Sequence, residues 1–373
     1  MSNEAAGDLV VMVVAAIPPS HSGIGAQALL LARELLAQGQ PTIVLTHRHR
    51  GRRDRHGVPI RHIGWGYPRR PLPAALFGLE AALWLLRNKR TIRAVHLHGG
   101  GVGPTSVGVA AHLLGLPAIY KVTRLGDDDP LAAARRRAGR VRSWVISRAR
   151  RVIATSPAIR DTCLEAGIEP ARIAEIPNGV DLARFLPADA EARRNARRSL
   201  GLPADALLAL YVGYVDARKR TSELIEFWSA VAGSRDILCL VGPIITPTSA
   251  ADPRVRILGS VPDPSAYYRA ADVFVFLSGE EGLPNAVLEA QASGLPAILS
   301  PLPGVHDYIV KSGESGIVLA DISLEAFATA WQAVRDPEFR TVLGAAARRN
   351  AERFDIRAVA CSYRDLYREC VGE

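Results

Sequence analysis

Short runs of consecutive apolar residues alternate along the chain with longer segments in which apolar residues recur every three or four positions. An apolar run covers 9–17, helical spacing with Leu29 and Leu36 on one stripe covers 27–38, and a second apolar run covers 42–46. Continuous apolar runs of this length are typical of strands buried on both faces, and the spacing between them is typical of amphipathic helices. The pattern predicts an α/β fold with a parallel sheet flanked by helices.

The same alternation continues along the chain and predicts further strands at 93–98, 117–123, 207–212, 237–241, 255–258, 273–277 and 297–300. It breaks between 178 and 203, where Pro, Ala and Arg dominate. A chain of 373 residues exceeds the size at which a single core keeps growing, so two domains are expected. We place the first at 1–185 and the second at 186–353, followed by an amphipathic helix over 354–373.

The segment 278–296 predicts a ligand cradle. Gly282 provides a turn after an apolar strand, and Pro284 fits the first turn of the following helix. A helix start attracts anions and hydroxyl oxygens, because its free N–H groups and its dipole point at the ligand. Glu281 would lie beside such a ligand, and Glu289, about one turn into the helix, could reach the same molecule. Alternatively, the carboxylates only complement the helix dipole.

Glu281 and Glu289, separated by seven residues within Glu-Gly-Leu-Pro-Asn-Ala-Val-Leu-Glu, resemble the hallmark of family 4 retaining glycosyltransferases with the GT-B fold. Other segments similar to that family are the loop at 23–25, the segments 149–157 and 176–185, the run 212–219 and Phe354-Asp355. The resemblance covers nearly the whole chain. It implies two Rossmann-like domains whose parallel sheets face across a cleft, with the last helix crossing back onto the N-terminal domain.

On the donor side, the resemblance implies a hexosyltransferase-type enzyme that uses a UDP- or GDP-sugar. It places Glu281 beside the donor sugar, Lys219 with Arg218 on the diphosphate, and Glu289 on the ribose diol. The backbone of the cradle would bind sugar hydroxyls or phosphate, through Gly282, Leu283, Pro284, Asn285 and Ala286. Two further donor-site candidates are Arg256, on the strand leading to the loop expected at the base, and Tyr214, which replaces the arginine that the family usually has there.

On the acceptor side, Gly23 and Gly25 would let the backbone approach the diphosphate closely, although a lone Gly-x-Gly can be an ordinary turn. His98, at the end of a predicted strand, is a candidate for acceptor contact, or is merely hydrogen-bonded. Thr123 and Arg124 stand where many family members have a histidine. Either the acceptor differs from that of those relatives or another residue orients it; glycans, lipid-linked sugars and small metabolites all remain open as hydroxyl acceptors.

Three other functions compete with a glycosyltransferase. A GT-B-like sugar-nucleotide epimerase would use the same donor site without a separate acceptor. A catalytically silent sugar-nucleotide-binding subunit would keep the donor site without turnover, which the retained Glu281 and Glu289 disfavour. A nicotinamide dehydrogenase is disfavoured because Ser22-Gly-Ile-Gly25 lacks the third glycine of the dinucleotide fingerprint.

Composition indicates what class of protein this is and in which compartment it is expected. Hydrophobic residues make up 48% and charged residues 22% of the chain, as in ordinary globular proteins. No apolar run reaches the roughly 18 residues that a membrane span needs, and the first residues carry Glu4 and Asp8 without Lys or Arg, so we expect a cytoplasmic protein. The 4 cysteines show no Cys-x-x-Cys spacing, so neither a zinc site nor a disulfide framework is expected.

The formal charge of +9 is mostly arginine, with a cluster over 135–151 that includes Trp144. We expect no nucleic-acid partner, because the arginine excess belongs to a chain that is rich in alanine and arginine together. Two interpretations of the cluster remain open: it contacts an anionic membrane peripherally, or it is a solvated helix face. Asp127-Asp128-Asp129 resembles the metal-binding motif of the other large glycosyltransferase fold. We predict neither metal nor cofactor, because Lys219 and helix N-termini supply the positive charge and aspartates before Pro130 suit helix capping.

Overall fold

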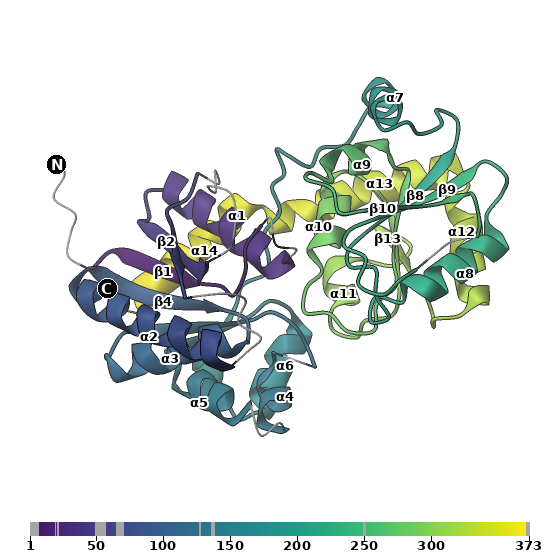
Figure 1. The fold of residues 1–373 in the computed structure, drawn as a ribbon. Helices are drawn as coiled ribbons and strands as arrows, with labels where there is room; N and C mark the ends of the chain where they lie inside the picture. Colours follow the sequence, from purple (N-terminus) through teal and green to yellow (C-terminus); the bar gives the residue numbers. More distant parts are fainter. Residues whose placement is uncertain are drawn as a thin grey trace. The chain divides into compact units, whose positions relative to one another are not determined.

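The computed structural model describes residues 7–18, 20, 22–48, 57–64, 71–126, 128–135, 139–248 and 251–370. The chain forms two compact units (Figure 1). Unit 1 comprises Met1–Gly179 with Ile356–Glu373, and unit 2 comprises Val180–Asp355. Each unit is an α/β domain built on one parallel sheet, as the apolar pattern predicts.

The sheet of unit 1 has seven strands in the order β3-β2-β1-β4-β5-β6-β7. Their bounds are β1 Leu9–Val13, β2 Thr42–His47, β3 Ile60–Ile63, β4 Ile92–His98, β5 Ala118–Val122, β6 Arg151–Ala154 and β7 Ile173–Glu175. All neighbours are parallel; Val11, for example, pairs with Ile43 on β2 and with Val95 on β4. The strand order therefore reverses direction between β1 and β4.

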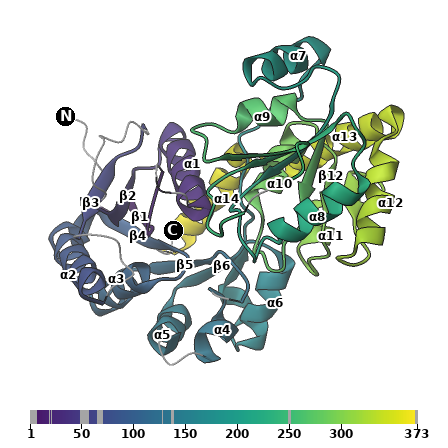
Figure 2. The same cartoon turned by 45° about the vertical axis from the view of Figure 1, so that its right-hand side comes forward.

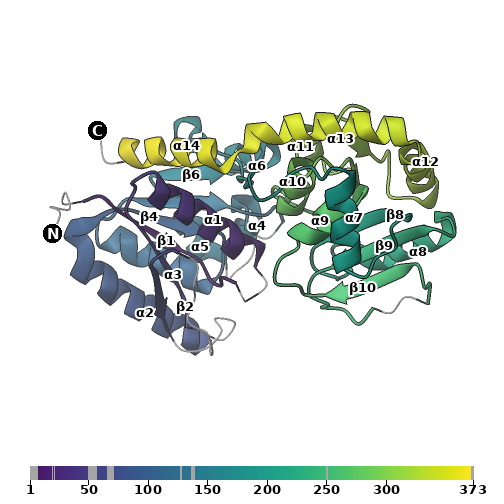
Figure 3. The same cartoon turned by 90° about the horizontal axis from the view of Figure 1, so that it is seen from above.

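Helices cover both faces of this sheet (Figure 3). One face packs against α1 (Gly23–Ala37) and α14 (Ile356–Glu369) around Val10 and Met12 of β1. The opposite face packs against α2 (Pro71–Asn88), α3 (Val102–Leu113), α5 (Arg140–Arg148) and α6 (Pro157–Glu165) around Val11 and Val13. Successive strand residues point to opposite faces, so a wholly apolar strand contributes to both cores at once. The short helix α4 (Pro130–Arg135) completes the unit, with single turns at Lys89–Thr91 and Pro170–Arg172.

The sheet of unit 2 has six strands in the order β10-β9-β8-β11-β12-β13, again parallel throughout. Their bounds are β8 Leu207–Val212, β9 Asp236–Val241, β10 Val255–Gly259, β11 Val273–Phe276, β12 Ala297–Leu299 and β13 Gly316–Val318. The helices are α7 Ala190–Ser199, α8 Thr221–Val231, α9 Ser265–Ala270, α10 Asn285–Ala292, α11 His306–Ile309, α12 Leu324–Val334 and α13 Pro337–Ala351, which ends in a turn at Glu352–Phe354 (Figure 2).

Element boundaries differ from the predicted ones where a cap decides the helix start. Helix α1 begins at Gly23, before the predicted 27–38, because Ser22 Oγ accepts a hydrogen bond of 3.0 Å from Gly25 N. Helix α10 begins at Asn285, and Pro284 occupies its N-cap position. The prediction that Pro284 lies in the first helical turn was therefore wrong by one residue, because its ψ of 110° is extended. The four cysteines are free thiols, and Cys361 is exposed.

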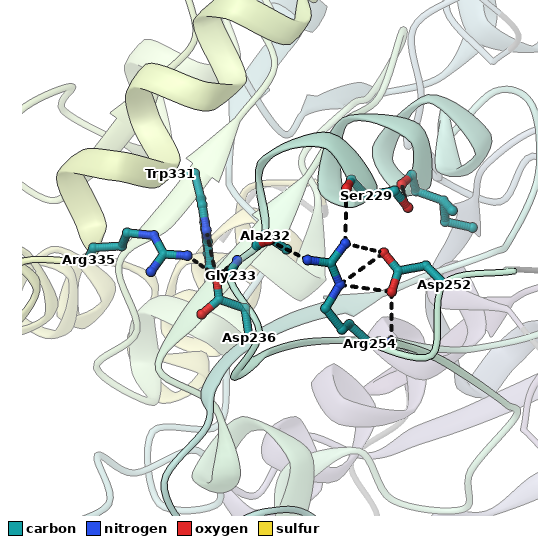
Figure 4. A network of polar contacts seen from close by, with 9 residues as sticks. Ser229, Ala232, Gly233, Asp236, Asp252, Arg254, Trp331 and Arg335 are labelled. Carbon is teal, nitrogen blue, oxygen red and sulfur yellow. Dashed lines mark hydrogen bonds and ion pairs between the residues drawn. The ribbon is translucent and has the colours of Figure 1, made fainter.

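A polar network ties β9 to the helices around it in unit 2 (Figure 4). The buried carboxylate of Asp236 accepts hydrogen bonds from Gly233 N at 2.7 Å and Trp331 Nε1 at 3.2 Å, and pairs with Arg335. Beside it, Arg254 pairs with Asp252 at 2.7 Å and donates to the carbonyl oxygens of Ser229 and Ala232. These charge-assisted bonds fix the ends of α8 and α12 against the sheet.

We expect Asp236→Ala to lower the free energy of unfolding of unit 2 by about 2–3 kcal/mol, because it removes the acceptor of three donors. Urea unfolding followed by tryptophan fluorescence measures this, since Trp331 contacts Asp236 directly. The matched control is Asp205→Ala: Asp205 pairs with Arg235 at 3.5 Å with both side chains largely exposed, and its loss should cost within about 0.5 kcal/mol. Equal effects of the two substitutions would contradict the structural role of Asp236.

Candidate functional site

The strand order of unit 2 reverses direction between β8 and β11, which places the carboxyl ends of these two strands at a topological switch point. Open α/β sheets bind ligands outside the carboxyl ends of the strands at such a point. Two loops begin there, at 213–220 after β8 and at 277–284 after β11. The sequence places its strongest donor-site candidates on these loops.

Lys219 is positioned by a tight turn before α8. Its backbone N–H donates to Asp216 Oδ1 at 2.8 Å, and the next residue, Arg220, has a left-handed φ of 48°. Such a φ is uncommon for a residue with a side chain. The turn directs the Lys219 ammonium over the Phe276 ring, with Nζ 4.5 Å from the ring centroid. This left-handed residue ends the loop after β8 and precedes the start of α8 at Thr221.

Glu281 receives several donors on one carboxylate oxygen. Its Oε1 accepts from Lys219 Nζ, from Ser278 Oγ at 2.6 Å and from Arg218 Nη1 at 3.4 Å. Ser278 is itself fixed, because its N–H donates to Ser300 Oγ at 2.9 Å and its carbonyl oxygen accepts from the same hydroxyl at 2.8 Å. The structure thus brings Lys219, Arg218 and Glu281 together.

The pair of Lys219 and Glu281 is largely withdrawn from water, with side-chain exposures of 9% and 10%. Burial lowers the pKa of the Lys219 ammonium, and the Glu281 carboxylate opposes that shift. Two opposite charges of this kind are costly to desolvate, and each depends on the other. Arg218 lies 3.4 Å from the same carboxylate oxygen, so two cations share one carboxylate and the cluster carries an excess of positive charge.

Glu289, the fifth residue of α10, accepts a hydrogen bond from the hydroxyl of Tyr268 on α9, at 2.8 Å to Oε2. The same hydroxyl lies 3.2 Å from the carbonyl oxygen of Ala286, so its single proton serves one of the two acceptors at a time. Burial raises the pKa of the Glu289 carboxyl to about 7. At neutral pH the group therefore stands between its acid and its carboxylate form.

The remaining donor-side candidates fall into two groups. Gly282, Leu283 and Pro284 are buried in the turn after β11, with Asn285 and Ala286 half-buried at the start of α10. The carbonyl oxygen of Tyr214 accepts from the Tyr211 hydroxyl at 2.6 Å, which fixes the loop after β8. Arg256, in contrast, does not join the cluster: it lies on the edge strand β10, and its Nη1 donates to the Gly201 carbonyl oxygen at 2.9 Å.

In unit 1 the loops after β1, β4 and β5 converge at the switch point of the seven-stranded sheet. A Cβ at Gly99 would lie 2.8 Å from Thr123 Oγ1 and 3.3 Å from Ile24 Cδ1. A Cβ at Gly25 would lie 2.1 Å from the Ala16 carbonyl oxygen, so the fold itself requires glycine there. Gly23 is the first residue of α1 beside it.

Thr123 and Arg124 belong to a network around Asp128. Thr123 Oγ1 donates to Asp128 Oδ2 at 2.7 Å, the Arg124 carbonyl oxygen accepts from Asp128 N at 3.3 Å, and Arg142 pairs with Asp128 at 3.6 Å. Asp129 accepts from Ala132 N at 2.8 Å, the capping role predicted for these aspartates. Asp127 lies outside the described residues. Among the residues that are described, no cluster of three or more His, Cys, Asp or Glu side chains is placed to hold a metal ion.

His98 lies at the carboxyl end of β4 and is buried, with an exposed fraction of 2%. Within the described part of the chain, neither of its ring nitrogens has a hydrogen-bond partner, and its ring centroid lies 4.0 Å from that of His96, with the two rings tilted by 33°. Burial, and then the charge of Lys121 opposite it on β5, lower the pKa of His98 well below its usual value. The imidazole is therefore neutral, and its contact with an acceptor stays a prediction.

Three residues of these sites were missed in the sequence. Tyr268, which lies between two predicted strands, orients Glu289, and Ser278, the first residue of the predicted cradle segment, orients Glu281. Neither residue was given a role from the sequence. Gly242 follows β9 with a φ of 142°, and a Cβ there would lie 1.9 Å from the Gly213 carbonyl oxygen. The Gly-Pro after an apolar strand was the available signal for this close approach of two loops.

Comparison with known proteins supports the same family over both units. The profile described as "Glycosyl transferase 4-like domain" matches residues 22–179, and that described as "Glycosyl transferases group 1" matches residues 206–335. D-inositol 3-phosphate glycosyltransferase of Kineococcus radiotolerans is 27% identical, over 94% of this chain and 91% of the relative. The enzyme of the same name from Geodermatophilus obscurus is 30% identical, over 80% and 72% of the two chains.

The fold agrees with solved glycosyltransferase structures. Anabaena Alr3699/HepE, solved in complex with UDP and glucose, superposes with a TM-score of 0.78 over 96% of this chain and 98% of that chain, at 17% identity. No helix among the described residues is long and apolar enough to cross a membrane. With both profiles matched in order and two parallel Rossmann-like sheets, the chain belongs to the group 1 glycosyltransferases and is a glycosyltransferase enzyme with the GT-B fold.

Proposed function

We propose that unit 2 binds a UDP- or GDP-sugar and that the enzyme transfers its sugar to a hydroxyl acceptor with retention of configuration. The observation that carries this proposal is the buried Lys219 and Glu281 pair at the switch point of the sheet. In this proposal the Lys219 ammonium contacts the diphosphate, and the Glu281 carboxylate accepts hydrogen bonds from the sugar hydroxyls. The start of α10 at Asn285, which follows Glu281 after the turn 282–284, adds backbone donors and the positive end of a helix dipole.

The proposed chemistry needs no protein nucleophile and no metal ion or cofactor. The bond from the anomeric carbon to the phosphate oxygen breaks, and the acceptor oxygen forms a bond to that carbon on the same face. The acceptor proton passes to a phosphate oxygen of the leaving diphosphate. Lys219, with Arg218 behind it, stabilises the charge that grows on the diphosphate, which is the step at which fixed charges contribute most.

The acceptor is the less defined half of the proposal. His98, Thr123 and Arg124 lie at the carboxyl ends of β4 and β5 in unit 1, where an acceptor would bind. Because the similar enzymes are named for D-inositol 3-phosphate, polyols and polyol phosphates belong on an acceptor panel beside glycans and lipid-linked sugars. Release of nucleoside diphosphate only when an acceptor is present would distinguish transfer from the epimerase reaction.

A thermal-shift panel of sugar nucleotides in a buffer containing EDTA tests the donor half directly. A ligand at about 100 times its dissociation constant stabilises the folded protein by about 2.7 kcal/mol, so one sugar nucleotide should raise the melting temperature clearly. Turnover of that donor in EDTA with an acceptor supports the metal-free reaction. No shift with any sugar nucleotide would reject the donor site, and a shift without turnover on any acceptor would favour a silent binding subunit.

Replacing Lys219 by Ala should reduce kcat by about a hundredfold or more while changing donor affinity less, because its charge matters most as the diphosphate leaves. The variant also leaves Glu281 without its main partner, so its melting temperature must be checked first. Lys311→Ala is the matched control, since Lys311 is an exposed lysine of unit 2 that pairs with the exposed Glu314 at 3.8 Å. Equal losses of affinity and turnover in Lys219→Ala would contradict the assigned role.

Glu289 should make donor binding depend on pH. Its pKa of about 7 means that the carboxyl is protonated below pH 7, whereas ribose hydroxyls donate best to the carboxylate. We expect calorimetric donor affinity to fall by about tenfold as pH decreases from about 8 to about 6, and Glu289→Gln to bind weakly with little pH dependence. A wild-type profile that is flat over this range would remove Glu289 from the ribose.

The same pKa shift predicts a stability effect that does not depend on any ligand. A carboxyl whose pKa is raised from 4.5 to about 7 holds its proton more tightly in the folded state, so folding stability decreases as pH rises through this window. Glu289→Gln removes the effect and should be more stable than the wild type at pH 8 by on the order of 1–3 kcal/mol, but not at pH 4. A constant difference between the two proteins would show that the carboxyl is not perturbed.

A further inference from the structure

The helices α2, α3 and α5 lie side by side on one face of the unit 1 sheet and form what we term the outer helical layer (Figure 2). In the described part of unit 1, every large hydrophobic side chain that is exposed belongs to this layer: Leu76, Leu79, Leu83, Leu86, Val102, Leu113 and Val141. The layer is therefore the apolar surface of its unit. Exposed apolar side chains that gather on one set of helices indicate a candidate interaction site.

Most of this apolar surface is a stripe of four leucines along α2. Leu76, Leu79, Leu83 and Leu86 are 41%, 60%, 44% and 55% exposed, and their spacing of three and four residues puts them on one side of the helix. Phe77, Ala81 and Leu85, on the other side, are fully buried in the core. A helix that is apolar all round is normally buried, so the leucine stripe requires a cover.

The charged residues of the outer helical layer are almost all of one sign. Five basic residues of the layer and of the turn after α2 are exposed: Arg87, Lys89, Arg90, Arg140 and Arg148. The sequences of α2, α3 and α5 contain one carboxylate, Glu80, which accepts a hydrogen bond of 2.7 Å from Gly64 N. Trp144, which the sequence suggests as a membrane contact, instead packs toward the core with its ring 4.8 Å from that of His112.

We propose that the outer helical layer docks on an anionic lipid surface, with the leucine stripe in the boundary between headgroups and acyl chains and the basic side chains on lipid phosphates. Amphipathic helices with leucine on one side and Lys or Arg at the rim bind in this way. A second copy of the chain is a poorer cover, because pairing two such layers would bring their basic rims together without carboxylates to neutralise them. Anionic headgroups supply the complementary charge.

Vesicle co-sedimentation of the full chain tests the proposal without using the glycosyltransferase reaction. The probe is a vesicle of phosphatidylglycerol and phosphatidylcholine in equal parts, compared with phosphatidylcholine alone, at about 0.1 M salt, where the Debye length is about 10 Å. The wild type should sediment with the anionic vesicles and be released at high salt. Absence of sedimentation with the anionic vesicles overturns the proposal.

Two pairs of variants identify the surface. Leu79→Glu with Leu83→Glu should reduce the vesicle partition coefficient by about tenfold or more, and Arg140→Ser with Arg148→Ser by on the order of fivefold for each residue. The controls are Val342→Glu, at an apolar position 59% exposed on α13, and Arg349→Ser on the same helix; both should bind as the wild type does. Melting temperatures and sugar-nucleotide shifts should stay unchanged in all four, so loss of docking is distinguishable from failure of the donor site.

The remaining outcomes reject lipid as the cover. Vesicle binding that survives Leu79→Glu with Leu83→Glu would place the contact on another surface. A wild type that is dimeric by light scattering, becomes monomeric in that variant and ignores vesicles would identify a second copy of the chain as the cover of the leucine stripe. The effect of salt on wild-type binding needs no variant, so the proposal remains testable even if the double substitution unfolds the protein.

Discussion

The buried ion pair between Lys219 and Glu281 is the interaction on which the donor site depends. Both groups are largely removed from water, and a buried pair seldom stabilises a fold more than apolar residues of the same size would. The protein nevertheless supports the pair: Ser278 and Arg218 both donate to Glu281, and Ser300 holds Ser278 in place. A costly arrangement that is supported in this way at a ligand-binding edge of the sheet is understandable if the pair serves catalysis.

The topology of unit 2 explains why the pair forms where it does. Strands β8 and β11 are neighbours, although 62 residues separate Lys219 from Glu281 along the chain. Because the two strands are parallel, the loops that follow them begin at the same edge of the sheet. At this edge the backbone of Gly242 also lies close to the Gly213 carbonyl oxygen. Tyr268 performs for Glu289 what Ser278 performs for Glu281, so each functional carboxylate has a hydroxyl donor of its own.

Much of this arrangement was predictable from the sequence, and its limits have physical reasons. Continuous apolar runs located β1, β2, β4 and β5 of one sheet and β8 to β12 of the other, whereas the short strands β3, β6, β7 and β13 were not predicted. The Glu281 and Glu289 motif led to the family. The contacts of Lys219 with Glu281 and of Tyr268 with Glu289 were not predictable, because they join residues that only the strand order brings together. The exposure of the leucine stripe of α2 was not predictable for a different reason. The sequence of an apolar helix does not show whether the helix is exposed on one side or buried on all sides.

The most direct test of this account is a crystal structure of the protein with its sugar nucleotide, or with the corresponding nucleoside diphosphate. The account predicts that a diphosphate oxygen lies about 2.7–3.2 Å from Lys219 Nζ, with the ribose hydroxyls on the Glu289 carboxylate. Glu281 would then face the sugar while remaining hydrogen-bonded to Ser278. A diphosphate bound elsewhere, with Lys219 still engaged only by Glu281, would contradict the central claim.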